Sequence, residues 1–160
     1  MLAACSLGIL SVRKMQTRLF TLRDMRDALI LCEGELARKQ PPLPELIQTV
    51  SEYADGQASV FFHELSKALA QLGEKSFFVI WEETLHRTIP GLPGESEREL
   101  LSLGKQLGRT TLSRQLSALE SCFRSLSASL ENGELQLEKE RGLRLGLPTA
   151  IGALLLILLL

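Results

Sequence analysis

The chain has 160 residues, which is enough for one compact domain and too few for two of ordinary size. Hydrophobic residues make up 45% of the chain but aromatic residues only 5%, a balance that favours helices packed on helices over a β-sandwich. The formal net charge of -1 provides no overall basic field that would attract nucleic acid. We therefore expect no nucleic-acid partner.

The three cysteines, Cys5, Cys32 and Cys122, are far apart in the sequence and form no Cys-x-x-Cys pair. An odd number at such wide spacing argues against a disulfide framework and against a zinc site. We predict that Cys32 and Cys122 are small buried hydrophobic residues.

Residues 1–12 form an apolar segment that is followed at once by Arg13 and Lys14. Twelve residues are too few to cross a bilayer, and no charged region precedes them as in a signal peptide. Leu2–Cys5 matches a lipoprotein cleavage box, but the full hydrophobic stretch that normally precedes such a box is missing. We interpret the segment as part of a membrane helix whose start is absent from this sequence.

Glycine and proline divide the middle region, residues 13–144, into segments of ordinary helix length. No segment alternates with a period of two, so we predict no β-sheet. Ser76 is the expected N-cap of the fourth helix. The sequence thus predicts an all-α fold, a bundle of about six helices at residues 16–39, 45–54, 58–72, 76–88, 95–107 and from 110 or 111 onward.

Two of these helices are long and carry apolar stripes. The last helix has a seam whose spacing alternates between four and three residues, as in a heptad repeat: Leu112, Leu116, Leu119, Phe123, Leu126 and Leu130. The first helix has a similar stripe: Met15, Leu22, Met25, Leu29, Cys32 and Leu36. We predict that the two helices pack as an antiparallel pair, with the shorter helices on its distal part. The alternative is a coiled coil between chains that uses the same leucines.

Residues 145–160 contain no charge and end in Leu-Leu-Leu-Ile-Leu-Leu-Leu. As a helix they would extend about 24 Å, slightly less than the roughly 30 Å of a hydrocarbon core. We predict a C-terminal membrane anchor; a central buried helix is the soluble alternative. Basic residues lie on the inner side of both apolar segments, so the positive-inside rule predicts that residues 13–144 are cytosolic: Arg13, Lys14 and Arg18, and Lys139, Arg141 and Arg144.

No catalytic motif occurs in the sequence. There is no phosphate loop of the GxxxxGK[ST] type, no HExxH and no GxSxG. His63 and His86 fall on different predicted helices, and the adjacent Glu82 and Glu83 would point about 100° apart on a helix. We therefore predict no catalytic, metal-binding or cofactor-binding residues, no cofactor and no small-molecule substrate.

Two surfaces are open to more than one interpretation. Arg23, Asp24, Arg26 and Asp27 alternate in charge, which is typical of a solvated helix face, and the functional alternative is a docking surface for a cytosolic partner. The segment Phe77–Leu85 is rich in bulky apolar side chains and is predicted to fill the core. Its alternative is an exposed groove that binds an amphipathic helical peptide.

Three stretches in this order resemble the stage III sporulation protein AB family of endospore-forming Firmicutes. The first is the long RLFTLRDMRDALILCEGEL helix, Arg18–Leu36, preceded by an apolar and a basic segment and followed by PLPELI at Pro42–Ile47. The second is LLSLGKQLGRT, with paired glycines at Gly104 and Gly108 and then Gln115. The third is a leucine-rich helix that runs into the C-terminal anchor. The resemblance covers most of the chain.

The resemblance implies a helical bundle similar to the cytosolic part of the inner-membrane platform protein of type II secretion and type IV pilus systems. It implies a place in the mother-cell cytosol, in a trans-envelope channel complex at the membrane around the forespore. Expected partners are the complex's cytosolic secretion-type ATPase and its other membrane proteins. Candidate docking residues are Arg23, Asp24, Arg26, Asp27, Gly104, Gly108 and Gln115.

One departure from the family concerns the N-terminus. Members usually have a complete first membrane helix, whereas only its final dozen residues are present here, so either the start of this sequence is misplaced or the protein is held in the membrane chiefly by its C-terminus. Two other functional hypotheses are kept for comparison. One is a tail-anchored groove protein that binds an amphipathic peptide. The other is a membrane-bound hydrolase, which no set of residues in the sequence supports.

Overall fold

The computed structural model describes the backbone of residues 2–158 and the side chains of residues 13–139. Within residues 2–158 it contains six α-helices, one short 3-10 helix and no β-strand, so the all-α prediction is confirmed. The bounds of the helices are α1 Leu2–Lys39, α2 Leu43–Tyr53, α3 Gly56–Ala68, η1 Leu69–Gln71, α4 Phe77–Thr88, α5 Gly94–Gln106 and α6 Leu112–Leu158.

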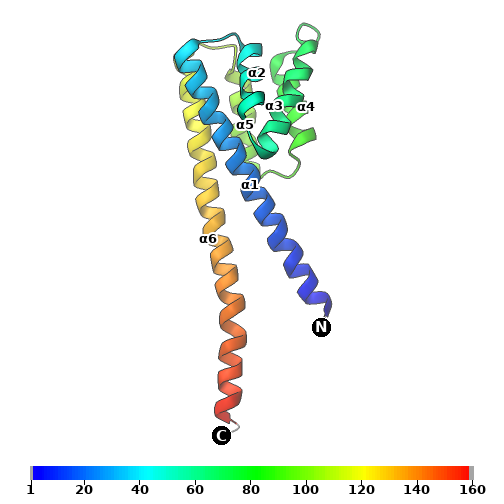
Figure 1. The fold of residues 1–160 in the computed structure, drawn as a ribbon, viewed down its shortest axis with the longest axis vertical. Helices are drawn as coiled ribbons and strands as arrows, with labels where there is room; N and C mark the ends of the chain where they lie inside the picture. The colour runs from blue at the N-terminus through cyan, green and yellow to red at the C-terminus, as the bar shows by residue number, and fades with distance from the viewer. Residues whose placement is uncertain (1, 159–160) are drawn as a thin grey trace.

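The two long helices α1 and α6 run antiparallel and side by side, as predicted (Figure 1). The shorter helices gather at one end of this pair, where α2, α3 and α5 pack against it and α4 packs on α3 and α5. At the other end α1 and α6 diverge, and both continue well past the bundle toward the ends of the chain. The molecule is therefore a compact bundle carried on a long helix pair.

The first helix is longer than the sequence predicted. We expected it to begin near Gln16, but α1 begins at Leu2 and includes the apolar segment without a break. The expectation was wrong because no proline or glycine lies between residues 9 and 33 to interrupt the helix. The last helix is also continuous and reaches Leu158.

The predicted C-terminal anchor, residues 145–160, lies partly in the described region. Its residues up to 158 are helical, whereas residues 159 and 160 fall outside the described part of the chain. Among the residues that the structure describes, no helix contains a stretch long and apolar enough to cross a membrane.

The breaks between the short helices follow local sequence chemistry. Pro41 and Pro42 separate α1 from α2, since proline lacks the N–H that would continue the first helix. Ser76 caps α4 as predicted, and its hydroxyl accepts a hydrogen bond of 3.4 Å from the backbone N–H of Val79. The third helix begins two residues earlier than predicted and ends in the short η1 turn.

The leucine seam of α6 packs within the same chain, with Leu119, Leu126 and Leu130 buried and the other three seam residues half-buried. Leu119 and Leu126 are fully buried, and so is Leu29 on the opposite stripe. Gly133 marks a close approach of the two helices, because a Cβ atom there would lie 2.4 Å from Leu19 Cδ2. The seam thus contributes to the core of one chain, and the coiled coil between chains stays an alternative prediction.

Aromatic side chains fill the second part of the core, between α3, α4 and α5. Phe61 and Phe62 lie edge-on to each other, and the Phe61 ring lies 5.0 Å from the ring of Trp81. The Trp81 indole N–H donates a hydrogen bond of 2.9 Å to the carbonyl of Leu100 on α5. Since Phe77, Trp81 and Leu85 are buried, the prediction that α4 fills the core is confirmed. The alternative of an exposed peptide groove on this face was wrong.

Candidate docking surface

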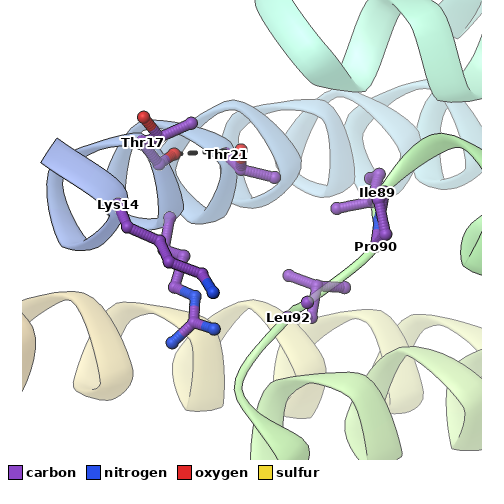
Figure 2. Close-up of a pocket in the computed structure, with 8 residues that line it drawn as sticks. Lys14, Thr17, Thr21, Ile89, Pro90 and Leu92 are labelled. Carbon is purple, nitrogen blue, oxygen red and sulfur yellow. Dashed lines mark hydrogen bonds between the residues drawn. The ribbon is translucent and has the colours of Figure 1, made fainter. Parts of the chain in front are cut away.

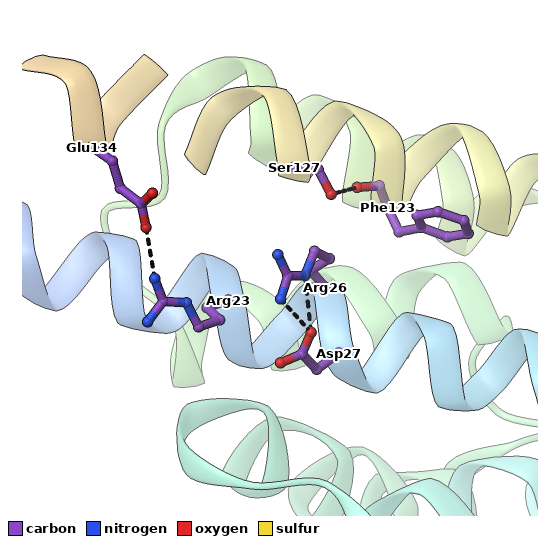
Figure 3. Close-up of polar contacts among 6 residues, drawn as sticks. All are labelled: Arg23, Arg26, Asp27, Phe123, Ser127 and Glu134. Carbon is purple, nitrogen blue, oxygen red and sulfur yellow. Dashed lines mark hydrogen bonds and ion pairs between the residues drawn. The ribbon is translucent and has the colours of Figure 1, made fainter. Parts of the chain in front are cut away.

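The four alternating charges of α1 do not form one continuous surface. Figure 3 shows Arg23 reaching across to Glu134 of α6, where the two side chains form an ion pair of 2.6 Å. Arg26 donates two hydrogen bonds to the adjacent Asp27, at 2.9 and 2.7 Å (Figure 3). Both pairs are substantially exposed, so each contributes little to stability.

Asp24 has a structural role that the sequence did not reveal. Its carboxylate accepts a hydrogen bond of 2.9 Å from the backbone N–H of Gln57, in the first turn of α3. Asp55, the residue that precedes α3, makes no capping hydrogen bond with its own side chain. Asp24 therefore caps α3 from another helix, and Gly56 leaves room for it, because a Cβ there would overlap the Asp24 carboxylate.

A surface cavity of about 280 Å³ lies beside Asp27, where α1 faces the connection between α2 and α3. We call it the acidic groove, and its lining residues are Asp24, Asp27, Ala28, Leu31, Tyr53, Ala54 and Asp55. Tyr53 is 71% exposed, and the Asp27 side chain is 57% exposed. The groove thus combines three carboxylates with an accessible aromatic ring, which suits a partner that presents basic and apolar groups.

Gly104 is buried in α5 and packs directly against the indole of Trp81. A Cβ atom at this position would lie 2.5 Å from Trp81 Cδ1 and 2.7 Å from Cγ. The absence of a side chain at Gly104 therefore lets α5 approach α4 closely enough for the Trp81 hydrogen bond to Leu100. No contact with a partner is needed to explain this glycine.

Gly108 and Gln115 lie together at the turn between α5 and α6. The Gln115 side-chain oxygen accepts a hydrogen bond of 3.1 Å from the Gly108 N–H, and its amide donates one of 2.8 Å to the Thr110 carbonyl. Gly108 has a φ of +73°, a conformation that glycine adopts at no steric cost. The structure thus brings these two candidate docking residues together, and their hydrogen bonds stabilise the turn.

The remaining titratable groups do not converge on a shared point. His86 pairs with Glu97 at 2.8 Å, and His63 is exposed on α3. Within the described part of the chain no three His, Cys, Asp or Glu residues are close enough to hold a metal ion. Burial raises the pKa of Cys32 and of Cys122 to about 12, so both thiols are protonated at neutral pH, as expected of small core residues.

Of the acidic groove, sequence reasoning found Asp24 and Asp27 and missed the other lining residues, among them the polar Tyr53 and Asp55. Tyr53 is the last residue of α2, and Asp55 lies in the connection to α3, where Asp55-Gly56 was interpreted only as a helix stop. A signal was present, since Tyr53 is the only tyrosine of the chain and falls at the end of an amphipathic helix. The exposure of Tyr53 depends on how α2 packs against α1. This packing is tertiary and cannot be read from the local sequence.

Taken together, the helices define the class of protein: an all-helical bundle in which four short helices pack on one end of a long antiparallel pair. The family model of stage III sporulation protein AB matches residues 1–160. The chain therefore belongs to the stage III sporulation protein AB family, a sporulation family and not a known family of enzymes, and the resemblance seen in the sequence is confirmed.

A solved structure of stage III sporulation protein AB is similar to this chain, with a TM-score of 0.66 and 23% sequence identity. The similarity covers 76% of this chain and 97% of the solved one. At this level of identity the likeness establishes the shared fold. The comparison with curated proteins finds no match.

Proposed function

We propose that this protein is a membrane-tethered platform of a sporulation channel complex, and that its bundle docks the secretion-type ATPase of that complex in the mother-cell cytosol. Membership of a sporulation family supports the setting. The sequence has no phosphate loop, so in this proposal the partner supplies ATP hydrolysis and the chain itself is not a catalyst.

The observation that carries the proposal is the position of the two apolar segments relative to the bundle. Leu19 of α1 packs on Gly133 of α6, so these two residues lie at the same height along the helix pair. Distances along both helices can be measured from this contact. Val12, the last residue of the first apolar segment, lies about 10 Å along α1 from that contact, and Leu145 lies about 18 Å along α6. Both segments thus begin on the same side of the bundle, as two anchors in one bilayer require (Figure 1).

The charges next to these segments support a cytosolic bundle. Arg13, Lys14 and Arg18 follow the first segment, and Lys139, Arg141 and Arg144 precede the second. Basic residues that flank membrane segments favour the cytoplasmic side. In this arrangement the bundle lies on the cytosolic side of the membrane, with the acidic groove accessible to a soluble partner.

Among the candidate docking residues, Asp27 is the cleanest position at which to test the contact. Asp24 also caps α3, so its replacement would perturb the fold as well as the surface, and Arg23 points toward Glu134 of α6 rather than into the acidic groove. Asp27 makes only an exposed pair with its neighbour, and it borders the acidic groove beside Tyr53.

The test is a pull-down of the complex's ATPase by the full-length protein in detergent. We expect Asp27→Arg to weaken retention about tenfold or more, because like charges at a docking contact are strongly unfavourable. Tyr53→Ala should weaken it as well. Glu74→Arg is the matched control, since Glu74 is exposed on a different turn and lies outside the acidic groove.

Equal retention of the wild type and of Asp27→Arg would exclude this groove as the contact. Failure of the wild type to retain the ATPase would exclude the docking role altogether. Deletion of the gene in the sporulating host tests the wider role, and normal forespore gene expression late in development would contradict it.

A further inference from the structure

A second cavity, of about 450 Å³, lies at the end of the bundle from which both long helices project. We call it the basic pocket. It is formed by one face of α1 and by the connection between α4 and α5 (Figure 2), and its lining residues are Lys14, Thr17, Arg18, Thr21, Ile89, Pro90, Gly91 and Leu92. In Figure 1 this connection lies on the side of the bundle that faces the chain ends.

The charged groups of the basic pocket are cationic. Lys14 and Arg18 are exposed and lie one helical turn apart, so their side chains share a face of α1. Neither forms an ion pair with any carboxylate whose side chain the structure describes, within residues 13–139. The Thr17 and Thr21 hydroxyls each donate a 3.0 Å hydrogen bond to a carbonyl of the preceding helical turn.

The opposite wall of the pocket is apolar. Ile89 is buried, Leu92 is half-buried, and Figure 2 shows Ile89, Pro90 and Leu92 facing α1 across the opening. Gly91 has a φ of +84°, and a Cβ there would lie 3.8 Å from an Arg18 guanidinium nitrogen. Arg18 and this connection are therefore neighbours, and the pocket places two cations opposite an apolar wall.

The position of the pocket along α1 points to the kind of anion it would meet. Because α1 is unbroken from Leu2 to Lys39, Lys14 and Arg18 lie about 3 and 9 Å beyond the apolar residue Val12. Each polar headgroup layer of a bilayer is roughly 5–7 Å thick. If residues 1–12 enter the bilayer, Lys14 lies within this layer, and Arg18 lies just beyond it, where its long side chain can reach back to the lipid phosphates.

We propose that the basic pocket binds the headgroup of an anionic phospholipid, with the phosphate between Lys14 and Arg18 and the glycerol region against Leu92 and Pro90. Two cations and an apolar wall match an amphiphile that carries one negative phosphate. This inference rests on the membrane tether of the proposed function. It adds that the end of the bundle itself contacts the lipid surface, so that lipid contact fixes the orientation of the bundle as well as its location.

The test uses the full-length protein in a zwitterionic detergent. It is titrated with short-chain phosphatidylglycerol, with phosphatidylcholine of the same chain length, with inorganic phosphate and with an acidic peptide. We expect saturable binding of phosphatidylglycerol and none of phosphatidylcholine. The double variant Lys14→Glu and Arg18→Glu should bind phosphatidylglycerol at least about 30-fold more weakly, since each basic residue near an anionic lipid contributes roughly a factor of five.

The matched control is Arg109→Glu with Arg114→Glu, which makes the same charge change at exposed positions near the turn between α5 and α6. This control should bind as the wild type does. Leu92→Ala should weaken phosphatidylglycerol binding at high salt as well as at low salt, because it removes an apolar contact. Thermal unfolding of each variant checks that the bundle remains folded.

The proposal is overturned if phosphatidylglycerol does not bind, or if the control variant loses as much affinity as the Lys14 and Arg18 variant. If inorganic phosphate or the acidic peptide binds more tightly than phosphatidylglycerol, the lipid is not the ligand of this pocket. Retention of the ATPase separates the two proposals. Loss of lipid binding with retained ATPase defeats only the lipid site, whereas intact lipid binding without ATPase retention defeats only the docking role.

Discussion

The contact between Gly104 and Trp81 shows how one missing side chain sets the distance between two helices. The indole occupies the space that a Cβ of Gly104 would need, and its N–H reaches the backbone of α5. Indole carbons held in a packed core cannot move aside as the end of a flexible chain could. A side chain at position 104 should therefore displace Trp81 and disturb the packing of the aromatic part of the core.

We predict that Gly104→Ala lowers the free energy of unfolding by about 1–3 kcal/mol, the usual cost of overpacking a core. Urea denaturation of the two proteins measures it. Gly34→Ala is the control, because Gly34 is also helical, is exposed and has no atom within 4 Å of the added methyl group. That control should be neutral or up to about 1 kcal/mol more stable. Equal effects at the two glycines would contradict the packing argument.

The two buried thiols make stability depend on alkaline pH. Burial raises the pKa of Cys32 and of Cys122 from 9.0 to about 12 in the folded chain, with Glu99 adding to the rise at Cys122. Above pH 9 the unfolded thiols lose protons while the folded ones keep theirs. The free energy of unfolding should therefore be unaffected by the thiols below pH 9 and should fall between pH 9 and 12.

At pH 10, one unit above the ordinary thiol pKa, the loss should be roughly 1.4 kcal/mol for each thiol. Urea denaturation at pH 8 and at pH 10 measures it. Cys32→Ala should be less stable than the wild type at pH 8 but should lose less stability on going to pH 10. Lysine and tyrosine ionisation is common to both proteins, so an identical loss would show that the Cys32 thiol does not contribute.

At the scale of helices, residues 18–36 show which features a sequence reveals and which it does not. The stripe of Leu22, Met25, Leu29 and Cys32 predicted a buried face, and each of these side chains is buried. Periodicity predicts such a face because the hydrophobic effect acts on whichever side of the helix is apolar. It does not say which neighbour covers that face.

The polar side of the same helix could not be assigned from sequence. Arg23 and Asp24 are adjacent, yet one reaches α6 and the other reaches α3, across 111 and 33 residues of sequence respectively. These partners become neighbours only after the helices pack. The predicted docking residues Gly104, Gly108 and Gln115 likewise have tertiary explanations that spacing alone does not give.

The link between α1 and α3 makes a specific prediction about Asp24. Asp24→Ala should lower the free energy of unfolding by about 1–2 kcal/mol, the cost of removing a good N-cap, because the Gln57 N–H loses its acceptor. Urea denaturation measures the loss. Asp27→Ala is the matched control, since it removes only an exposed ion pair and should change stability by about 0.5 kcal/mol or less. A similar cost at both positions would argue against capping across helices.

At the scale of the whole molecule, the two long helices extend far beyond the bundle. With 38 and 47 residues, α1 and α6 are about 57 and 70 Å long. Each is a single unbroken helix and joins the bundle directly to one apolar segment. A partner that moves the bundle would therefore also tilt the apolar segments.

Membrane association is the prediction that belongs to this scale. In the sporulating host, the full-length protein should sediment with membranes, and a version without residues 145–160 should shift toward the soluble fraction, since that segment is the longer apolar one. Immunoblotting of the two fractions measures the shift. Circular dichroism of the shortened protein should still show a helical fold. Identical fractionation of both versions would contradict the C-terminal anchor.

The position of Trp81 has a practical consequence for the unfolding measurements proposed above. It is the single tryptophan of the chain, it is fully buried, and its ring meets residues of α3 and α5. Its fluorescence emission should therefore be that of a water-shielded indole and should shift to longer wavelength when the aromatic core opens. The protein thus carries a native optical probe of its folding, placed away from both the acidic groove and the basic pocket.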